Sequence, residues 1–574
     1  MKVTNLCIWL MGTCIGSLLF SCSGAAFASK KAGVCAPSEP SMLGQKKHGV
    51  LTTCWSPTRK KTWKKWSFGV RVGCWKSWHG NGALKTIECW RSGLREGKQG
   101  EWHPDGIPHS TRHFRGGKLH GVSRVWFANG RLRVEGHWWY GKTHGTWKTY
   151  NRQGERIEKL SHVMGEPHGI WRQWWSPQQL RSEGRWFHGK PVGMHRRWNA
   201  KGQLLHQDTY KHGHLHGLQF SWYAGGQVKE VSAFIGGQQH GWVTTWHENG
   251  AKQSTGLWSF GKRVGEWLRW NDEGKLSAKQ HFKEGKASGT WTYWYKSGQK
   301  RAEGRYDTNE REGTWRYWWS NGQLKSQGKW CYGQLCGKWT HWWRNGKTKA
   351  IEHWKEDDAD KRWEHWFPNG QRRAVYGFLK GKQNGTSKTW YQNGQMRSLV
   401  HHIKNKRQGK WTVWYRDGKI KRVTHWKNGK KHGVFEEWYR DGKKKHTYHY
   451  QEDQKTGLWM QWYPSGQKKL SLHFKHNEQQ GLSQQWHPNG ALRSKGLWKS
   501  DRPHGLWKTW FSNGKPRSAG GWLDGVKSGR WSEWFENGRR RTITFWSHGK
   551  RCGQYSSWDR KGTLSTKQYP PCLP

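Results

Sequence analysis

The sequence predicts an all-β fold, an elongated single-layer antiparallel meander of about 22 β-hairpin repeats. Three observations predict it: a pattern that recurs every 24 residues, two turn signals in each copy, and no helical periodicity between them. Glycine stands at residue 82 and at every twenty-fourth residue to 562, in 20 of 21 places. A fixed period of this length is typical of repeat proteins, in which each unit packs only against its neighbours.

Composition supports this class and indicates the kind of partner. The 574 residues include 51 Trp and 75 Gly, but only 33% are hydrophobic, which is too few for several globular cores. Aromatic residues make up 15% of the chain, so regularly placed rings can supply the burial that a disordered chain lacks. The formal net charge of +62 favours an extended molecule with anionic partners.

The first 28 residues are predicted to be a signal peptide. An apolar run over residues 6–20 follows Lys2, and Ala-Phe-Ala at residues 26–28 is a small-x-small cleavage pattern. Alternatively, residues 19–22 are similar to a lipoprotein box, which would place a lipid on Cys22. No long apolar run follows, so no transmembrane span is expected and the protein is predicted to be extracytoplasmic: secreted, periplasmic, or an outer-membrane lipoprotein.

The rest of the chain divides into a predicted N-terminal linker or cap, residues 29–48, and a repeat array, residues 49–574. A second glycine series runs from Gly49 to Gly553 and is broken only by Lys361; we number each copy from this glycine as position 1. Asn-Gly or Asp-Gly at positions 9 and 10 predicts a two-residue type I′ turn, and Gly-Lys at positions 21 and 22 marks a second turn. Each copy therefore contains two strands.

These turns predict a strand register that the cysteines can test. The first turn would pair positions whose numbers sum to 19, and the second would pair positions that sum to 43. Two cysteine pairs then fall directly opposite each other, a third pair closes the C-terminal copy, and the fourth follows by elimination. The predicted disulfides are Cys74 with Cys89, Cys331 with Cys336, Cys552 with Cys572, and Cys35 with Cys54.

The same register assigns side chains to two faces. Positions 3, 7 and 18 share one side, where an aromatic ring at position 3 can lie flat over glycine at position 16. Trp at position 6 and Lys or Arg at position 13 are expected to face each other on the other side, as a cation–π stripe. The candidate binding residues of this stripe are Trp318, Lys325, Trp342, Lys349, Trp366, Arg373, Trp390, Arg397, Trp414, Lys421, Trp438, Lys445, Trp462, Lys469, Trp486, Arg493, Trp510, Arg517, Trp534 and Arg541.

The repeat resembles a known module. Residues 182–193, Ser-Glu-Gly-Arg-Trp-Phe-His-Gly-Lys-Pro-Val-Gly, are similar to the core of a MORN repeat, and residues 134–145 and 302–313 are similar. The 24-residue spacing most resembles the bacterial variant found in YwqK-type antitoxins. The resemblance implies a MORN-type β-solenoid or rod that acts as a scaffold or as a surface that contacts lipids and partners.

Two functions are compatible with these features. The first is non-enzymatic binding of anionic envelope or matrix polymers, and the alternative is a protein-binding scaffold of the antitoxin or immunity type. Nucleic acid would bind only non-specifically. Enzyme activity and a cofactor are not expected, because the same groups recur on open faces instead of forming one unique pocket.

No metal site is expected either. His212, His214 and His216 straddle a predicted turn, so their side chains should diverge. The acidic segment 356–360 stands where other copies have Gly-Lys, and we expect an irregular loop there more than a calcium site.

Overall fold

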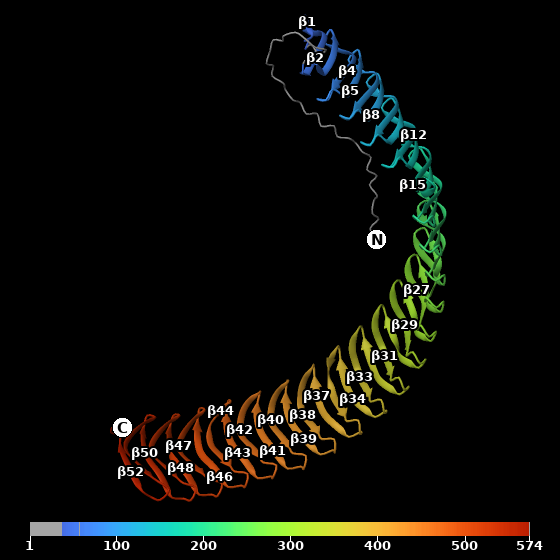
Figure 1. The fold of residues 1–574 in the computed structure, drawn as a ribbon. Coiled ribbons are helices and arrows are strands. Elements are labelled where there is room, and N and C mark those ends of the chain that lie inside the picture. Colours follow the sequence, from blue (N-terminus) through green and yellow to red (C-terminus); the bar gives the residue numbers. More distant parts are fainter. Residues whose placement is uncertain (1–36, 57, 573–574) are drawn as a thin grey trace. The chain divides into compact units, whose positions relative to one another are not determined.

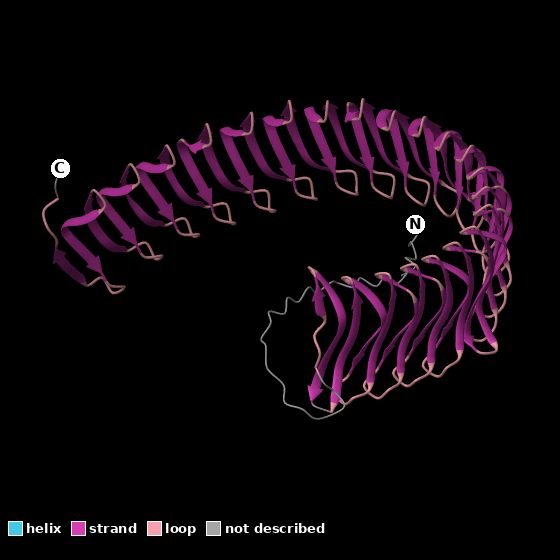
Figure 2. Cartoon of the chain, turned by 90° about the horizontal axis from the view of Figure 1, so that it is seen from above, coloured by secondary structure: helices cyan, strands magenta, loops and turns pink. Residues whose placement is uncertain are grey.

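The computed structural model describes residues 37–56 and 58–572, and it is all-β. Its 52 strands form an open antiparallel hairpin meander, which confirms the predicted fold class (Figure 1). Between the strands lie only loops and turns (Figure 2). The predicted signal peptide, Cys22 and Cys35 lie outside the described residues.

The chain divides into two compact units, one up to Gln238 and one from Gln239, and β22 (Gln238–Gln239) lies at the division. The strands of the first unit are β1 (Ser41–Leu43), β2 (Lys46–Ser56), β3 (Arg59–Ser67), β4 (Val70–Trp78), β5 (Leu84–Arg91), β6 (Leu94–Arg95), β7 (Gly97–Trp102), β8 (Pro108–Arg115), β9 (Lys118–Leu119), β10 (Gly121–Trp126), β11 (Leu132–Trp139), β12 (Lys142–Tyr150), β13 (Arg156–Val163), β14 (Glu166–Pro167), β15 (Gly169–Ser176), β16 (Gln179–Phe187), β17 (Lys190–Trp198), β18 (Leu204–Lys211), β19 (His214–Leu215), β20 (Gly217–Trp222) and β21 (Val228–Ile235).

The second unit contains the remaining strands. They are β23 (Gly241–Trp246), β24 (Lys252–Ser259), β25 (Lys262–Trp270), β26 (Leu276–Lys283), β27 (Lys286–Trp294), β28 (Lys300–Asp307), β29 (Glu310–Trp318), β30 (Leu324–Cys331), β31 (Gln334–Trp342), β32 (Thr348–Lys355), β33 (Asp358–Trp366), β34 (Arg372–Leu379), β35 (Lys382–Gln383), β36 (Gly385–Trp390), β37 (Met396–Ile403), β38 (Lys406–Trp414), β39 (Ile420–Lys427), β40 (Lys430–Trp438), β41 (Lys444–Gln451), β42 (Gln454–Trp462), β43 (Lys468–Lys475), β44 (Glu478–Gln479), β45 (Gly481–Trp486), β46 (Leu492–Lys499), β47 (Arg502–Trp510), β48 (Pro516–Leu523), β49 (Val526–Trp534), β50 (Arg540–Ser547), β51 (Lys550–Trp558) and β52 (Leu564–Gln568).

The Asn-Gly turn is one residue longer than predicted. In the copy that begins at Gly313, the Trp319 amide donates to the Gln323 carbonyl (2.8 Å) and the Gly322 amide donates to the Trp319 carbonyl (2.9 Å). Only Gly322 has a positive φ within this loop, 86°. This is a three-residue loop with a type I turn and a left-handed glycine, not the type I′ turn that we expected.

The second turn does have two residues, but it lies one position earlier than predicted. Tyr332 and Gly333 both have positive φ, 51° and 77°, as a type I′ turn requires. Cys331 therefore pairs with Gln334, and Cys336 pairs with Lys329. The two cysteines are diagonal neighbours on one face and not directly opposite each other, and they are still joined, with Cα atoms 5.9 Å apart.

A β-bulge at position 1 restores the predicted register further from this turn. Beyond Gly337, whose φ is 65°, Thr340 pairs with Gln327, so the position numbers again sum to 43. The bulge explains the second glycine series, because a left-handed conformation is strained for other residues. Lys361, the one exception, adopts the same conformation with φ 55°.

A second bulge changes the face of position 13. Tyr317 pairs with Ser326 but Trp318 pairs with Leu324, which leaves Lys325 as the extra residue of its strand. Position 6 therefore faces position 12, and the expectation that positions 6 and 13 oppose each other is wrong. Position 13 instead lies on the side of positions 5 and 7.

The sheet consequently has two different faces. The aromatic face carries positions 3, 5, 7, 13, 14, 16, 18 and 23, and the opposite face carries positions 2, 4, 6, 12, 15 and 17. A buried cluster that includes Trp267, Phe282, Ala287 and Trp291 lies on the aromatic face. A single-layer sheet thus gains its core by covering one side of itself with rings.

The remaining disulfide predictions agree with the described residues. Cys74 pairs directly with Cys89 in the ladder and is bonded to it, and Cys552 is bonded to Cys572. Cys54 is also disulfide-bonded, and its expected partner lies outside the described residues.

The acidic segment 356–360 is regular, which corrects the expected irregular loop. Glu356 and Asp357 form a two-residue turn with φ of 51° and 63°, and β33 begins at the next residue. The Asp357 carboxylate accepts a hydrogen bond from the Leu335 amide (2.6 Å), so aspartate replaces glycine at position 21 and also links neighbouring copies.

Candidate aromatic and cationic binding face

The aromatic face is built on a ladder of rings at positions 3 and 18. Trp330 contacts Trp339 with centroids 5.7 Å apart, and Tyr306 contacts Trp315 at 5.1 Å, both edge to face. Trp315 is only 1% exposed. These rings are the floor of the face, and the charged groups lie on or beside them.

Many rings at position 3 are held by the copy before them. Trp339 lies over Gly328, where an added Cβ would overlap the indole ring, and its Nε1 donates to the Lys329 carbonyl (2.9 Å). The predicted packing of a ring on glycine is therefore confirmed, but the ring covers the glycine of the preceding copy. This contact and hydrogen bond fix the ring relative to the next hairpin.

Cations at position 23 lie against the rings of positions 3 and 18, a site that sequence reasoning missed. Arg407 is 4.3 Å from the Trp411 centroid and 4.7 Å from that of Trp426. Position 23 pairs directly with position 18. The signal was available, because Lys or Arg recurs at this position and position 18, its partner, is aromatic in most copies. Residues with such contacts are Arg71, Arg263, Arg311, Arg407, Lys455, Lys527 and Arg551.

The predicted cations of position 13 form a second row, over the aromatic ring of position 7. Nine of the ten predicted residues make this contact. The pairs are Lys325 with Trp319 (4.7 Å), Lys349 with Trp343 (5.0 Å), Arg373 with Phe367 (6.0 Å), Arg397 with Tyr391 (5.8 Å), Lys421 with Tyr415 (5.4 Å), Lys445 with Tyr439 (5.8 Å), Lys469 with Tyr463 (5.5 Å), Arg517 with Phe511 (5.7 Å) and Arg541 with Phe535 (5.7 Å).

The tenth cation, Arg493, stands beside His487 at position 7. Most cations of this row are exposed, so their charges remain available to a ligand.

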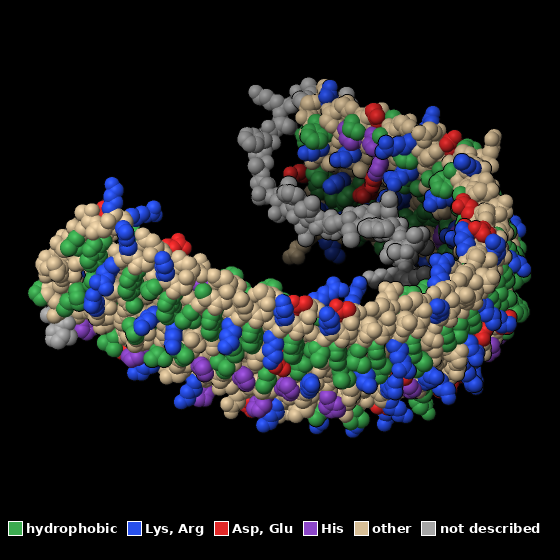
Figure 3. Space-filling view, turned by 90° about the horizontal axis from the view of Figure 1, so that it is seen from below, with side chains coloured by type: hydrophobic (Ala, Val, Ile, Leu, Met, Phe, Trp, Pro, Cys, Tyr) green, Lys and Arg blue, Asp and Glu red, His purple; other side chains and the backbone are tan. Residues whose placement is uncertain are grey.

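The tryptophans of position 6 lie on the opposite face, where they are partly exposed. Lys300, at position 12, is 5.8 Å from the Trp318 ring, and Lys468 is 5.8 Å from the Trp486 ring. The structure thus divides the predicted stripe between two faces. Figure 3 shows apolar side chains gathered in a band toward the C-terminal end, with Lys and Arg along both margins.

Hydrogen bonds between copies hold the edge of the aromatic face in place. The Tyr391 hydroxyl donates to the Trp414 carbonyl (2.8 Å), and Asn393 Nδ2 donates to the Arg416 carbonyl (2.9 Å). Equivalent bonds join positions 7 and 9 of many copies to the next copy. The Asn of the Asn-Gly pair therefore serves this ladder, a role that the turn prediction did not include.

The face is strongly cationic. The chain has 101 Lys and Arg against 39 Asp and Glu, so more than half of the cations have no acidic residue of their own to pair with. Burial, and then the neighbouring charge of Arg269, lowers the pKa of Arg263, and burial and Arg422 lower that of Arg407. Arginine nevertheless stays protonated at neutral pH, so the rings are covered by permanent charges.

Other kinds of site can be described briefly. Within residues 37–56 and 58–572, no three His, Cys, Asp or Glu side chains are grouped so that they could hold a metal ion. The same residues include no helix with the length and apolarity needed to cross a bilayer.

A family model described as a MORN repeat variant matches seven segments of the second unit: residues 263–284, 311–331, 383–405, 407–428, 431–452, 455–476 and 503–520. The match confirms the predicted repeat family, whereas the narrower YwqK-type assignment stays a prediction. No curated protein matches the sequence significantly.

Solved structures that match include the TcdB2-TccC3-Cdc42 crystal structure, which is 10% identical with a TM-score of 0.12, over 91% of this chain and 35% of that chain. The Photorhabdus luminescens Tc holotoxin pore is also 10% identical with a TM-score of 0.12, over 90% of this chain and 36% of that chain. This chain spans about a third of the length of those proteins. At that TM-score we infer nothing from them.

Proposed function

Because this chain is a MORN-repeat protein, we propose that it is a non-enzymatic exported scaffold that binds anionic envelope or matrix polymers through its aromatic face. The observation that carries the proposal is the row of mostly exposed cations at position 13, nine of the ten predicted ones held over a ring at position 7. A ring under each cation restricts the side chain and leaves its outer surface open to an anion. Repetition along the sheet then suits a ligand that itself repeats.

Charge distribution favours a polymer over a small ligand. Neighbouring copies are separated by two strands, so successive cations of one row lie about 10 Å apart. That spacing is close to the Debye length at physiological salt, and a polyanion can neutralise many of these charges at once and release its counterions. The binding should therefore be strong at low salt and fall steeply as salt rises.

Export is part of the proposal. Three disulfides join described residues, and disulfides persist mainly in oxidising compartments. The predicted signal peptide lies outside the described residues, so its cleavage has to be measured on the mature protein by N-terminal sequencing.

The proposal predicts that binding depends on which face carries the charge. Reversing four position 13 cations, Arg373, Lys445, Lys469 and Arg541, to Glu should lower the salt at which the protein elutes from an alginate resin and from a polyphosphate resin. If all four contact the polymer, the slope of log K against log salt should fall by roughly 3.

The matched control reverses Arg372, Lys444, Lys468 and Arg540, the preceding residues, which carry the same charge on the opposite face. This variant should elute closer to the wild type. Equal shifts for the two variants would mean that only net charge matters, and the aromatic face would lose its assigned role. Recovery of one defined protein from envelope extract in high salt, unaffected by either variant, would favour the protein-binding alternative.

A further inference from the structure

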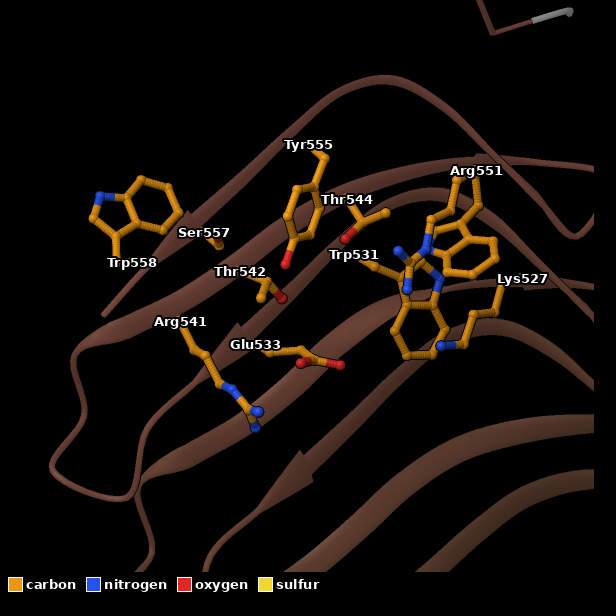
Figure 4. Close-up of a pocket in the computed structure, with 11 residues that line it drawn as sticks. Lys527, Trp531, Glu533, Arg541, Thr542, Thr544, Arg551, Tyr555, Ser557 and Trp558 are labelled. Atoms are coloured by element: carbon orange, nitrogen blue, oxygen red, sulfur yellow. The ribbon is translucent and has the colours of Figure 1, made fainter. Parts of the chain in front are cut away.

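The aromatic face of the second unit contains a hollow across β49, β50 and β51, which we call the terminal hollow (Figure 4). Its volume is about 260 Å³. Trp531 and Thr544, which are 8% and 7% exposed, lie in its floor, and Trp558 lies at its margin. A hollow of this size on an otherwise repetitive face can hold one ring-sized group.

The sequence explains why the hollow forms at this place. In several earlier copies a tryptophan at position 3 covers glycine at position 16, as Trp531 covers Gly520. In the last pair of copies, Tyr555 stands at position 3 and Thr544 at position 16. The smaller ring and the added side chain leave the space between the two strands unfilled.

One end of the terminal hollow is aromatic and cationic. Lys527 Nζ is 4.4 Å from the Trp531 centroid and 4.8 Å from that of Trp546, and the Arg551 guanidinium is 5.5 Å from Trp546. Within the described residues neither cation forms an ion pair, and Arg551 makes one hydrogen bond, to the Tyr569 hydroxyl (3.3 Å). This end therefore offers two positive charges beside flat rings.

The middle of the hollow is polar. Glu533 pairs with Thr542 in the ladder, yet in the part of the chain that is described the side chains of Glu533, Thr542 and Thr544 form no hydrogen bond. At the equivalent positions of an earlier copy, Thr509 and Ser518 bond each other at 2.6 Å. Figure 4 shows the Tyr555 hydroxyl directed toward Thr542. Carboxylate and hydroxyl groups so placed can accept and donate hydrogen bonds to a ligand.

We infer that the terminal hollow binds a single sugar ring that carries a carboxylate, as a uronate residue does. The partly exposed indole ring of Trp546 packs against the CH groups of the sugar ring, and Lys527 and Arg551 bind its carboxylate. Glu533 accepts hydrogen bonds from sugar hydroxyls. A phosphate group fits less well, because Glu533 would repel its second charge and it has no hydroxyl-rich ring to fill the hollow.

This inference rests on the proposed function, because it names the chemical class of one unit of the polymer that the aromatic face would bind. It also adds a discrete site with its own stoichiometry. Polymer binding by the position 13 row involves many equivalent contacts, whereas the terminal hollow should take one short oligosaccharide per chain.

The experiment titrates an alginate tetrasaccharide into the full-length protein by isothermal calorimetry, with maltotetraose as the neutral probe. The wild type should bind the acidic tetrasaccharide at one site per chain and bind maltotetraose at least about tenfold more weakly. Lys527→Ala with Arg551→Ala should weaken the acidic tetrasaccharide about tenfold or more. Thr542→Val with Thr544→Val keeps the shape and all charges and should also weaken it.

The matched control is Lys431→Ala with Lys455→Ala. These residues occupy position 23 on the same face and also lie over rings, Tyr450 and Trp459, but outside the hollow. The control should bind the tetrasaccharide as the wild type does. Because the control and the Lys527 and Arg551 variant each remove two positive charges, these two variants should lose the same small amount of retention on alginate resin. Unchanged hydrogen exchange in β49–β51 for the two hollow variants, and in β40–β42 for the control, establishes that each variant is folded.

The outcomes separate the two proposals. If the wild type is retained on alginate resin but shows no saturable tetrasaccharide binding, the terminal hollow is not a sugar site while the proposed function stands. Equal weakening by the hollow variants and the control would overturn the inference in the same way. If the protein binds neither the resin nor the tetrasaccharide, the proposed function fails as well. If the tetrasaccharide binds but a phosphate probe outcompetes it, the ligand of the terminal hollow is a phosphate and not a uronate.

Discussion

His402 illustrates how single residues set the acid stability of the array. It occupies position 18, where other copies have mostly aromatic rings, and it is only 8% exposed. Burial, and then the charges of Arg407 and His401, hold the pKa of His402 below its usual value of 6.5. Protonation is therefore easier in the unfolded chain than in the folded one. The stability that neutral His402 contributes is present above about pH 6.5 and is lost as the pH falls below it.

We predict that His402→Phe reduces the acid sensitivity of its own repeat. In the wild type, amide exchange in β36, β37 and β38 should accelerate between pH 7.5 and pH 5.5, after correction for the intrinsic pH dependence, and in the variant this acceleration should shrink. His401→Gln, on the exposed side of the same strand, is the control and should retain most of it. If amide exchange accelerates as much in His402→Phe as in the wild type, groups other than His402 cause the acid response.

At the scale of the strand pair, several copies pack position 16 against position 3 of the next copy by matching a small residue with a large one. Where position 16 is glycine, position 3 of the next copy is a large ring, as in Gly328 and Trp339. In some copies a large residue at position 16 is matched by a small one at position 3, as in Tyr376 and the buried Ser387, whereas Tyr448 and Trp459 are both large and stack with ring centroids 4.2 Å apart. Both arrangements fill the same space above the sheet, because interiors tolerate neither a void nor an overlap.

A double-mutant cycle tests whether position 16 and position 3 of the next copy compensate each other in size. Gly328→Tyr alone should destabilise the β29–β31 region by about 1–3 kcal/mol through overlap with Trp339, and Trp339→Ser alone by about 3–5 kcal/mol through the cavity that it leaves. The double variant recreates the Tyr376 and Ser387 arrangement, so its cost should be smaller than the sum by at least about 1 kcal/mol. Hydrogen exchange at β29–β31 measures each term. Simple additivity would show that the two positions do not share one packing site.

The element scale also shows what the sequence could and could not predict. The period and the two hairpins per copy followed from fixed spacing, since each depends only on which residues recur, and the register of the first hairpin gave the Cys74–Cys89 bond. Cys331 and Cys336 are bonded as diagonal neighbours and not in the predicted register, and the Cys35–Cys54 pair stays a prediction. The exact turn lengths did not follow from spacing, because Asn-Gly suits both a type I′ turn and a three-residue loop with a left-handed glycine. The bulge beside Lys325 is a one-residue shift with no composition signal, and it moved the predicted cations to the other face.

The whole molecule is held together by nearest neighbours. Each strand pairs only with strands close to it in the chain, and no pairing in the described residues links distant copies. Stability in such an array is approximately a sum of copy and interface contributions, so a local change should stay local. An end copy has one interface fewer, and the disulfide between Cys552 and Cys572 compensates for this at the C-terminal end of the second unit.

Replacing both cysteines of this terminal disulfide by serine should loosen only the end of the second unit. The bond closes a loop with a sequence separation of 20, for which loop entropy predicts a loss of roughly 3 kcal/mol. Hydrogen exchange should accelerate in β51 and β52 and return to wild-type rates by β48. Replacing Cys331 and Cys336, with a separation of 5 and strands on both sides, should cost less and affect β30 and β31 alone. If loss of the terminal disulfide instead accelerates hydrogen exchange throughout the second unit, the copies of that unit unfold as one cooperative block. The terminal hollow would then depend on distant interfaces for its stability.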